Sequence, residues 1–287
     1  MQTLKPRVPI DVLTIEIIRL LHAACNDIGV RWVIVGATAR IIILEHVLGL
    51  QPARATRDVD FAVAVEDWET FEELKRKLVI TGHFAVSTSK EHRLYYSQAE
   101  PPYEGGIAVD LVPFGGVEDP KFIISWPREA DTHLNVIGCA DVLAGAMVVE
   151  FDQDTHVPIA SLPGQALLKI IAWHDRRAET DAKDARDLLI LLRAYVDSQD
   201  ADRVYSLKPA TCEDLDWDRE LMGAYLMGSD AIQLASIETQ GQVRMVLSDR
   251  GRHQQLVEDM SAGMPGRDDA VSHAEKLLDA FEGGFAP

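Results

Sequence analysis

The chain has 287 residues, of which 47% are hydrophobic and 26% are charged, and its formal net charge is −18 at pH 7. This length suffices for one large domain or two ordinary domains with cores of their own. The strong negative charge disfavours broad, nonspecific attraction to nucleic acids and to anionic membranes. The sequence has no apolar run long enough to span a bilayer, and its start has the spacing of an amphipathic helix rather than a signal peptide.

The first half of the chain alternates helical and strand-like patterns. Gly and Pro-rich turn sequences, such as PPYEGG, separate the strand-like pieces near its end. This alternation predicts a mixed β-sheet flanked by helices, within a first domain of residues 1–160. The elements that we expect there lie, in chain order, at residues 11–28, 30–35, 36–50, 57–65, 66–82, 83–89, 91–98 and 105–114.

The second half of the chain reads as helical, which gives an α+β fold with a helical domain of residues 161–287. Two strong helical patterns cover residues 162–179 and 182–198, and a final one covers residues 273–284. The loop-like sequence MSAGMPGRDD precedes this last helix and predicts that it is loosely attached.

Cysteine usage indicates a reducing environment. Cys25, Cys139 and Cys212 are isolated in the sequence, and their spacing is not that of a metal site. We therefore expect reduced thiols that fill core positions, in a cytoplasmic protein.

Two aspartates interrupt a sequence, TRDVDFAV, that otherwise reads as a half-buried strand. Alternate residues of a strand share a face, so Asp58 and Asp60 lie on one side, roughly 6–7 Å apart at the backbone. Their carboxylates can converge on one hard divalent cation, which prefers oxygen ligands. If the strand GIAVDLVPF pairs beside them, Asp110 completes a cluster of three carboxylates, whose mutual repulsion a bound metal would remove.

A structural interpretation of the same aspartates stays open. Asp58 can cap a turn, Asp60 can face solvent on an exposed sheet face, and Asp110 can be a polar residue with satisfied hydrogen bonds. Pairs of aspartates at this spacing are frequent, so the pair alone does not decide between the two interpretations.

The sequence VIVGATAR indicates a phosphate-binding turn between a strand and a helix. A helix start offers unpaired N–H groups and a partial positive charge, which suit phosphate. Gly36 lets the backbone approach a ligand closely, and Thr38 offers a hydroxyl in the first turn. The motif is neither a Walker loop nor a GxGxxG fingerprint, and it gains weight because the aspartate strand follows.

The helical half carries a second group of charged residues, in LLKIIAWHDRRAETDAKDARDLLIL. Lys169 and Arg176 fall on one stripe of a helix, and Lys169 can reach the β- and γ-phosphates of a nucleotide as a point charge. Asp184 and Asp187 lie on one face of the next helix. The charge-rich segment also fits a solvated, salt-bridged helix pair, and this alternative stays open.

The order of these motifs resembles the nucleotidyltransferase fold shared with DNA polymerase beta and, more closely, the AbiEii/AbiGii toxin family of nucleotidyltransferases. In that family a Gly-Gly or Gly-Ser turn opens a helix and a TxDxD motif follows, which residues 36–39 and 56–60 match. Ala37 stands where the family has its second Gly or Ser. The family's lysine, its arginine two turns later and its (K/R)DxxDL helix match Lys169, Arg176 and residues 183–188. The resemblance covers roughly residues 10–195.

The resemblance implies a nucleotidyltransferase-like fold and metal-dependent transfer of a nucleoside monophosphate from an NTP to an acceptor hydroxyl. It implies Mg²⁺ or Mn²⁺ as the cofactor, and Asp184 as a residue that orients or deprotonates the acceptor. Residues and resemblance together predict the site. Its catalytic residues are Asp58, Asp60, Asp110, Lys169 and Asp184, its metal ligands are Asp58, Asp60 and Asp110, and its nucleotide-binding residues are Gly36, Ala37, Thr38, Thr56, Arg57, Arg176 and Asp187.

The resemblance also implies partners: a tRNA 3′ end or a protein side chain as the acceptor, and an antitoxin protein that opposes growth inhibition. One alternative is a small-molecule enzyme of the aminoglycoside type, because an acidic surface suits a polycationic acceptor. Another is a catalytically degenerate protein that binds nucleotide without transferring it. The motive for this alternative is Ala37, which replaces the family's second Gly or Ser. An RNA acceptor needs a local basic groove, which could be built from Arg54, Arg57, Lys90, Arg93, Lys169, Arg176, Arg177 and Lys183.

Overall fold

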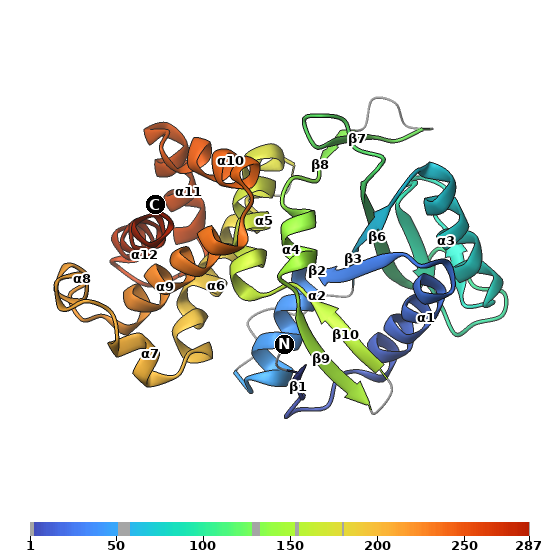
Figure 1. The fold of residues 1–287 in the computed structure, drawn as a ribbon, viewed down its shortest axis with the longest axis horizontal. Coiled ribbons are helices and arrows are strands. Elements are labelled where there is room, and N and C mark those ends of the chain that lie inside the picture. Colours follow the sequence, from blue (N-terminus) through green and yellow to red (C-terminus); the bar gives the residue numbers. More distant parts are fainter. Residues whose placement is uncertain (1–2, 51–57, 128–132, 153–154, 180, 287) are drawn as a thin grey trace. The chain divides into compact units, whose positions relative to one another are not determined.

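A computed structural model describes the chain except for residues 1–2, 51–57, 128–132, 153–154, 180 and 287. The chain forms two compact units, Met1–Ala160 and Ser161–Pro287 (Figure 1). All the described strands belong to the first unit, and the described elements of the second unit are helices. The predicted class is confirmed: a mixed sheet flanked by helices is followed by a helical half.

The elements of the first unit fall into strands and helices. Its strands are β1 (Thr3–Leu4), β2 (Arg31–Val35), β3 (Val59–Val65), β4 (Phe84–Val86), β5 (Arg93–Tyr96), β6 (Ile107–Gly115), β7 (Ile123–Ser125), β8 (His133–Asn135), β9 (Met147–Asp152) and β10 (Thr155–Ile159). Its helices are α1 (Val12–Ile28), α2 (Gly36–Ile41), the π-helical η1 (Ile42–Val47), α3 (Trp68–Ile80) and α4 (Cys139–Ala144).

Among the described residues, eight strands form one sheet in the order β1-β9-β10-β2-β3-β6-β5-β4, and β7 pairs with β8. β3 runs parallel to β6 and antiparallel to β2, so the sheet is mixed. The strand patterns at residues 83–89, 91–98 and 105–114 correspond to β4, β5 and β6. The centre of the sheet therefore joins the phosphate-turn strand, β2, to the two aspartate strands.

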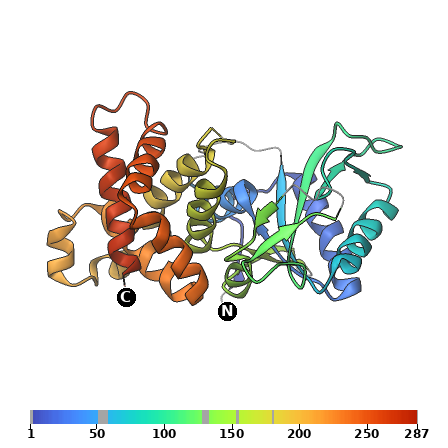
Figure 2. The same cartoon turned by 90° about the horizontal axis from the view of Figure 1, so that it is seen from above.

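One face of β3 is apolar, and α3 packs on β3 while α1 packs on the neighbouring β2. Phe61 is fully buried and packs edge to face on Trp32 of β2, with ring centroids 5.7 Å apart. Trp32 in turn meets His22 of α1 at 5.9 Å, and α3 lies beside α1 (Figures 1 and 2). Because side chains alternate along a strand, this packing directs Asp60 to the opposite face.

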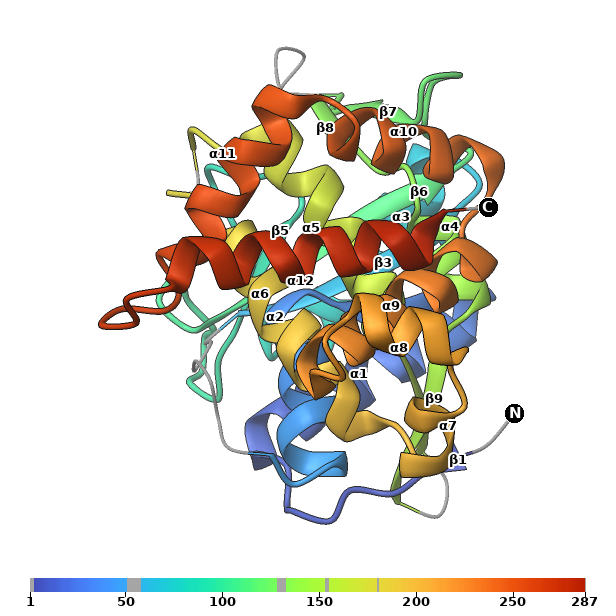
Figure 3. The same ribbon diagram turned by 90° about the vertical axis from the view of Figure 1, so that its left-hand side faces the viewer.

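The second unit consists of α5 (Leu162–Arg176), α6 (Lys183–Ala194), the 3₁₀ helix η2 (Tyr195–Ser198), α7 (Ala201–Tyr205), α8 (Pro209–Asp214), α9 (Arg219–Leu234), α10 (Ile237–Leu247), α11 (Arg250–Ser261) and α12 (Ala270–Phe285). Figure 3 shows α12 from the side, lying across the neighbouring helices of this unit.

The last helix, α12, is closely packed on α9, and the prediction of a loose attachment was wrong. A Cβ atom at Gly228 of α9 would overlap the carbonyl oxygen of Phe281, and one at Gly284 would overlap that of Tyr225. Phe281 is fully buried. The apolar stripe of α12 holds the helix in place, and the loop at residues 260–269 does not loosen it.

The three cysteines are buried free thiols, in agreement with the expected role as core fillers. Burial raises the pKa of Cys25 and of Cys139 to about 12, so the reactive thiolate is scarce at neutral pH. Among the described residues, no helix combines the length and apolarity that crossing a membrane requires.

Candidate functional site

Asp60 of β3 and Asp110 of β6 are direct partners in the parallel register of the two strands. On its other side Asp110 pairs with Arg93 of β5. Side chains of paired residues project from the same face, so the three form a row across the sheet. Asp58 directly precedes β3, two residues before Asp60, and its backbone oxygen accepts a hydrogen bond from Thr38. The register thus brings two of the three predicted carboxylates, those of Asp60 and Asp110, together on one face.

Arg93 binds both oxygens of Asp110. Its Nε donates to Oδ1 and its Nη2 donates to Oδ2, each over 2.6 Å. The two side chains are 19% and 14% exposed, so water screens the pair only partly. The hydrogen bonds and charge of Asp110 raise the pKa of Arg93, which stays a cation. Arg93 therefore offsets part of the repulsion between the neighbouring carboxylates. From the sequence, a bound metal alone was expected to do this.

The role of Arg93 was missed by sequence reasoning, which named it only among basic residues. In the segment EHRLYYSQ, Arg93 alternates with the buried Leu94, so its face of the strand was readable. Its partner was not, because local pattern does not reveal which strand lies beside β5.

The Gly36 turn lies against the Asp60 carboxylate. Val35 pairs with Asp60 across β2 and β3, so the chain turns into α2 directly beside this side chain. Gly36 has φ +67°, and a Cβ there would overlap the carboxylate and lie 3.1 Å from the Asp60 Cβ. Only glycine meets both conditions without strain. The residue predicted to allow close approach of a ligand also allows close approach of Asp60.

The hydroxyl of Thr38 is used inside the protein. Its Oγ1 donates to the backbone oxygen of Asp58 at 2.8 Å, and Thr38 is buried, as is Ala37. This hydrogen bond ties α2 to the start of the aspartate strand. Thr56 and Arg57, the other predicted nucleotide-binding residues of this unit, lie outside the described residues.

A cavity of about 780 Å³ opens beside Asp58. Its wall is largely apolar and includes Ile42 of η1 and Ile107 of β6. Among the described lining residues, the acidic side chains are Asp11, Glu45 and Asp58. Of the three predicted carboxylates Asp58 alone lines this cavity; Asp60 and Asp110 are not among its described lining residues.

The predicted charged residues of the second unit form a network of their own. Lys169 donates to Asp184 Oδ1 and to Asp187 Oδ2, each over 2.7 Å, and Arg176 Nε donates to Asp184 Oδ2 over 3.0 Å. Both carboxylates are fully buried. The network links α5 to α6. The alternative of a solvated, salt-bridged helix pair is right about the ion pairs and about the exposed residues 175–179, whereas Asp184 and Asp187 are buried.

Burial and charge act against each other in this network. Burial lowers the pKa of Lys169, but the two carboxylates outweigh it and the net shift is upward. Burial raises the pKa of Asp184, but Lys169 and Arg176 outweigh it and the net shift is downward. Lys169 and Asp184 therefore stay charged near neutral pH.

Four of the eight cations considered for a basic groove are paired within their own unit. Three of them are Arg93, Lys169 and Arg176, whose ion pairs are described above. The fourth is Arg177, which binds Asp259 over 2.5 Å. Paired cations attract a polyanion less than unpaired ones, so the described residues give limited support to an RNA groove.

Comparisons with known proteins give one extensive match and several remote ones. The model of the family described as nucleotidyl transferase AbiEii toxin, type IV TA system, matches residues 19–273. No curated protein matches the chain.

Two solved structures illustrate the remote matches. An antigenic nucleotidyltransferase-like protein from Paracoccidioides brasiliensis is 16% identical, with a TM-score of 0.43, over 93% of this chain and 100% of that chain. The Thermotoga maritima CCA-adding enzyme complexed with tRNA is 12% identical, with a TM-score of 0.26, over 99% of this chain and 85% of that chain. TM-scores this low say nothing about substrate. The family match spans most of the sequence and confirms the resemblance seen in its motifs: the chain belongs to the AbiEii family of nucleotidyl transferase toxins.

Proposed function

We propose that the aspartate face of the first unit transfers a nucleoside monophosphate from an NTP to an acceptor hydroxyl, with Asp58, Asp60 and Asp110 at its centre. The observation that supports this most is the contact of the Gly36 turn with Asp60, beside Asp110 in register. A phosphate-binding turn and a carboxylate pair are what a nucleotide and its cation require.

The donor set fits Mg²⁺ or Mn²⁺. Asp58 and Asp60 offer carboxylate oxygens, and the missing side chain of Gly36 lets the Asp60 carboxylate lie against the turn. When bound, the cation would polarise phosphate oxygens and offset the charge that develops during transfer. The backbone at residues 36–38 would bind phosphate oxygens, and Thr38 would position the strand through Asp58.

Asp110 is suited to orient the acceptor. An arginine fork occupies two of the lone-pair directions of its carboxylate, and others can still accept a hydrogen bond from a hydroxyl. Because Arg93 holds both oxygens of Asp110, the carboxylate is fixed in direction, which suits it to orient a hydroxyl. It would join the metal ligands only with a rearranged Arg93 contact.

For the second unit we propose a structural role of the Lys169 network, which holds α5 and α6 together through buried charges. The family resemblance gives Lys169, Arg176, Asp184 and Asp187 a part in nucleotide or acceptor binding as well. A Lys169→Arg variant keeps the positive charge of the network but changes the shape of the side chain. It therefore tests the role in nucleotide or acceptor binding separately from the structural role of the charge.

The acceptor that we propose from the family is a tRNA 3′ end or a protein hydroxyl, and an antitoxin protein would oppose the resulting toxicity. A second candidate is a polycationic small molecule of the aminoglycoside type. The net charge of −18 and the acidic residues of the cavity beside Asp58 favour it.

One experiment separates these possibilities. The protein is incubated with each α-labelled NTP and Mg²⁺, with total tRNA, with an aminoglycoside mixture, or alone. We expect label on one acceptor, lost in Asp60→Asn and kept in the control Glu69→Gln, which removes an exposed carboxylate of α3. Nucleotide binding without transfer, equally strong in both variants, would instead identify a degenerate nucleotide-binding protein.

A further inference from the structure

A second group of metal-ligating side chains lies between α11 and α12 of the second unit. His253 Nε2 of α11 is 3.1 Å from Asp279 Oδ1 and 3.8 Å from Glu282 Oε2, both on α12. One ligand atom from each of the three residues lies within 4.8 Å of the others. Asp279 and Glu282 are three residues apart, so they share a face of the helix.

The contact between His253 and Asp279 has the distance of a hydrogen bond but not its alignment. The Nε2 of His253 is buried and has no hydrogen-bond partner among the described residues, although Asp279 Oδ1 is within reach. Ligand atoms around a metal ion behave in this way, because they point to a common centre rather than to one another.

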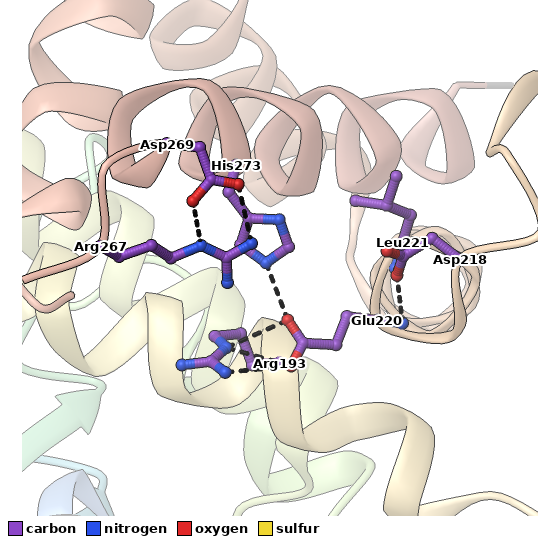
Figure 4. A network of polar contacts seen from close by, with 7 residues as sticks. All are labelled: Arg193, Asp218, Glu220, Leu221, Arg267, Asp269 and His273. Atoms are coloured by element: carbon purple, nitrogen blue, oxygen red, sulfur yellow. Dashed lines mark hydrogen bonds and ion pairs between the residues drawn. The ribbon is translucent and has the colours of Figure 1, made fainter.

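A second histidine of this unit provides the contrast. His273 Nε2 and Glu220 Oε2 form a hydrogen bond of 2.8 Å, and Arg193 binds the same carboxylate (Figure 4). The unit therefore contains an ordinary histidine–carboxylate hydrogen bond, and the arrangement at His253 differs from it.

The separations also fit a metal ion of known size. Zinc is bound tetrahedrally at about 2.0–2.2 Å by nitrogen and oxygen ligands, which places ligand atoms about 3.3–3.6 Å apart. The two distances from His253, 3.1 and 3.8 Å, bracket this range. Small side-chain movements would bring both carboxylates into place.

The surroundings are acidic and accessible. A cavity of about 590 Å³ borders all three residues. Its described lining has four carboxylates, those of Glu258, Glu275, Asp279 and Glu282, against the guanidinium of Arg250. A cation would relieve this excess of negative charge.

We propose that His253, Asp279 and Glu282 bind a first-row divalent transition metal, with Zn²⁺ as the best match, and that the ion clamps α12 to α11. An imidazole nitrogen with two carboxylates suits Zn²⁺, whereas Mg²⁺ and Ca²⁺ prefer oxygen ligands alone. Three protein ligands leave a fourth position for water, which the cavity can supply.

The test uses Co²⁺ as a coloured substitute for Zn²⁺, in full-length protein carrying Asp58→Asn and Asp60→Asn to remove the carboxylates of the first unit. We expect visible absorption from one Co²⁺ per chain, displaced by Zn²⁺ and not by Mg²⁺, and a higher melting temperature with Zn²⁺. His253→Ala should abolish the absorption, and Glu282→Gln should weaken Co²⁺ binding about tenfold or more.

Glu275→Gln is the matched control, because it removes a carboxylate of the same helix and cavity outside the three ligands. It should bind Co²⁺ as the parent does. Glu282 is 44% exposed, so its substitution keeps the test valid where His253→Ala fails to fold. Folded parent protein that gives no Co²⁺ absorption, or affinity unchanged in Glu282→Gln, would overturn the site.

Discussion

Asp60 and Asp110 are register partners on parallel strands, yet their carboxylates have different neighbours. The Gly36 turn lies against Asp60, whereas Arg93 binds both oxygens of Asp110. Two adjacent carboxylates with different neighbours can carry different roles, because one lies against the backbone of a turn while the other is held by an arginine.

Gly36→Ala should disrupt the site through steric overlap. Alanine at φ +67° has a strained backbone, which costs about 1 kcal/mol, and its Cβ overlaps the Asp60 carboxylate. We expect the free energy of unfolding to fall by about 3 kcal/mol and nucleotidyl transfer to be lost. Urea unfolding and label transfer measure the two effects.

Gly29→Ala is the control for backbone strain. Gly29 has φ +70°, and nothing lies within 4 Å of a Cβ built there. Its substitution should cost about 1 kcal/mol and leave transfer unchanged. Equal losses of stability in the two variants would show that Asp60 does not lie against the turn.

Arg93→Met should expose the dependence of Asp110 on its partner. The variant leaves a carboxylate that is 14% exposed without its counter-charge, next to Asp60. We expect about 2 kcal/mol less stability and a loss of transfer. In the double variant Arg93→Met/Asp110→Asn the stability loss should be smaller than the sum of the single losses, with transfer still absent. Additive losses in this cycle would mean that the pair contributes nothing as a pair.

Local pattern was enough to predict part of the site. The alternation in VDFAVAV predicted that Asp60 lies opposite the buried face, and the strand, glycine and helix order predicted the turn at Gly36. Both features depend on near neighbours in sequence. The pairing of β3 with β6 depends on strand order, because β4 and β5 lie between them in the chain. Local pattern does not reveal strand order, so this pairing was predicted only as a condition for the cluster with Asp110.

Other features could not be predicted for related reasons. Helical spacing predicted that Lys169 and Arg176 share a stripe, but the packing of α5 on α6 decides that Asp184 binds both. β10 contains Pro158, and proline within a strand pattern argues against a central position. In the fold β10 nevertheless lies between β9 and β2, because tertiary packing outweighs propensity.

Lys169→Met should destabilise the second unit in a pH-dependent way. It leaves two fully buried carboxylates without their shared cation, for a loss of about 3 kcal/mol near pH 7. The pKa of Asp184 is lowered on folding from its ordinary 3.8, so its contribution is present above that value and is lost as pH falls through the folded pKa. The pKa of Lys169 is raised from 10.5, so its contribution is lost only as pH rises through a still higher value.

Lowering the pH should therefore reduce the difference in free energy of unfolding between Lys169→Met and the parent protein. In the variant Asp184 lacks one of the two cations that lower its pKa, so it takes up a proton at a higher pH, which removes the cost of its buried charge. Urea unfolding at pH 7 and pH 4.5 measures this difference, with Lys208→Met, an exposed lysine of the same unit, as the control. A loss that is the same at both pH values would assign the effect to packing of the lysine chain.

Gly284→Ala should show that α12 is held against α9. Alanine in a helix is normally favoured over glycine by up to about 1 kcal/mol. At Gly284 its Cβ would overlap the carbonyl oxygen of Tyr225, so we expect a net loss of about 2 kcal/mol, measured by urea unfolding. The adjacent Gly283→Ala meets only the Tyr225 ring, at 3.7 Å, and should keep or slightly raise stability. If both variants were as stable as the parent, α12 would be free to move away from α9, and the overlap would have no consequence in solution.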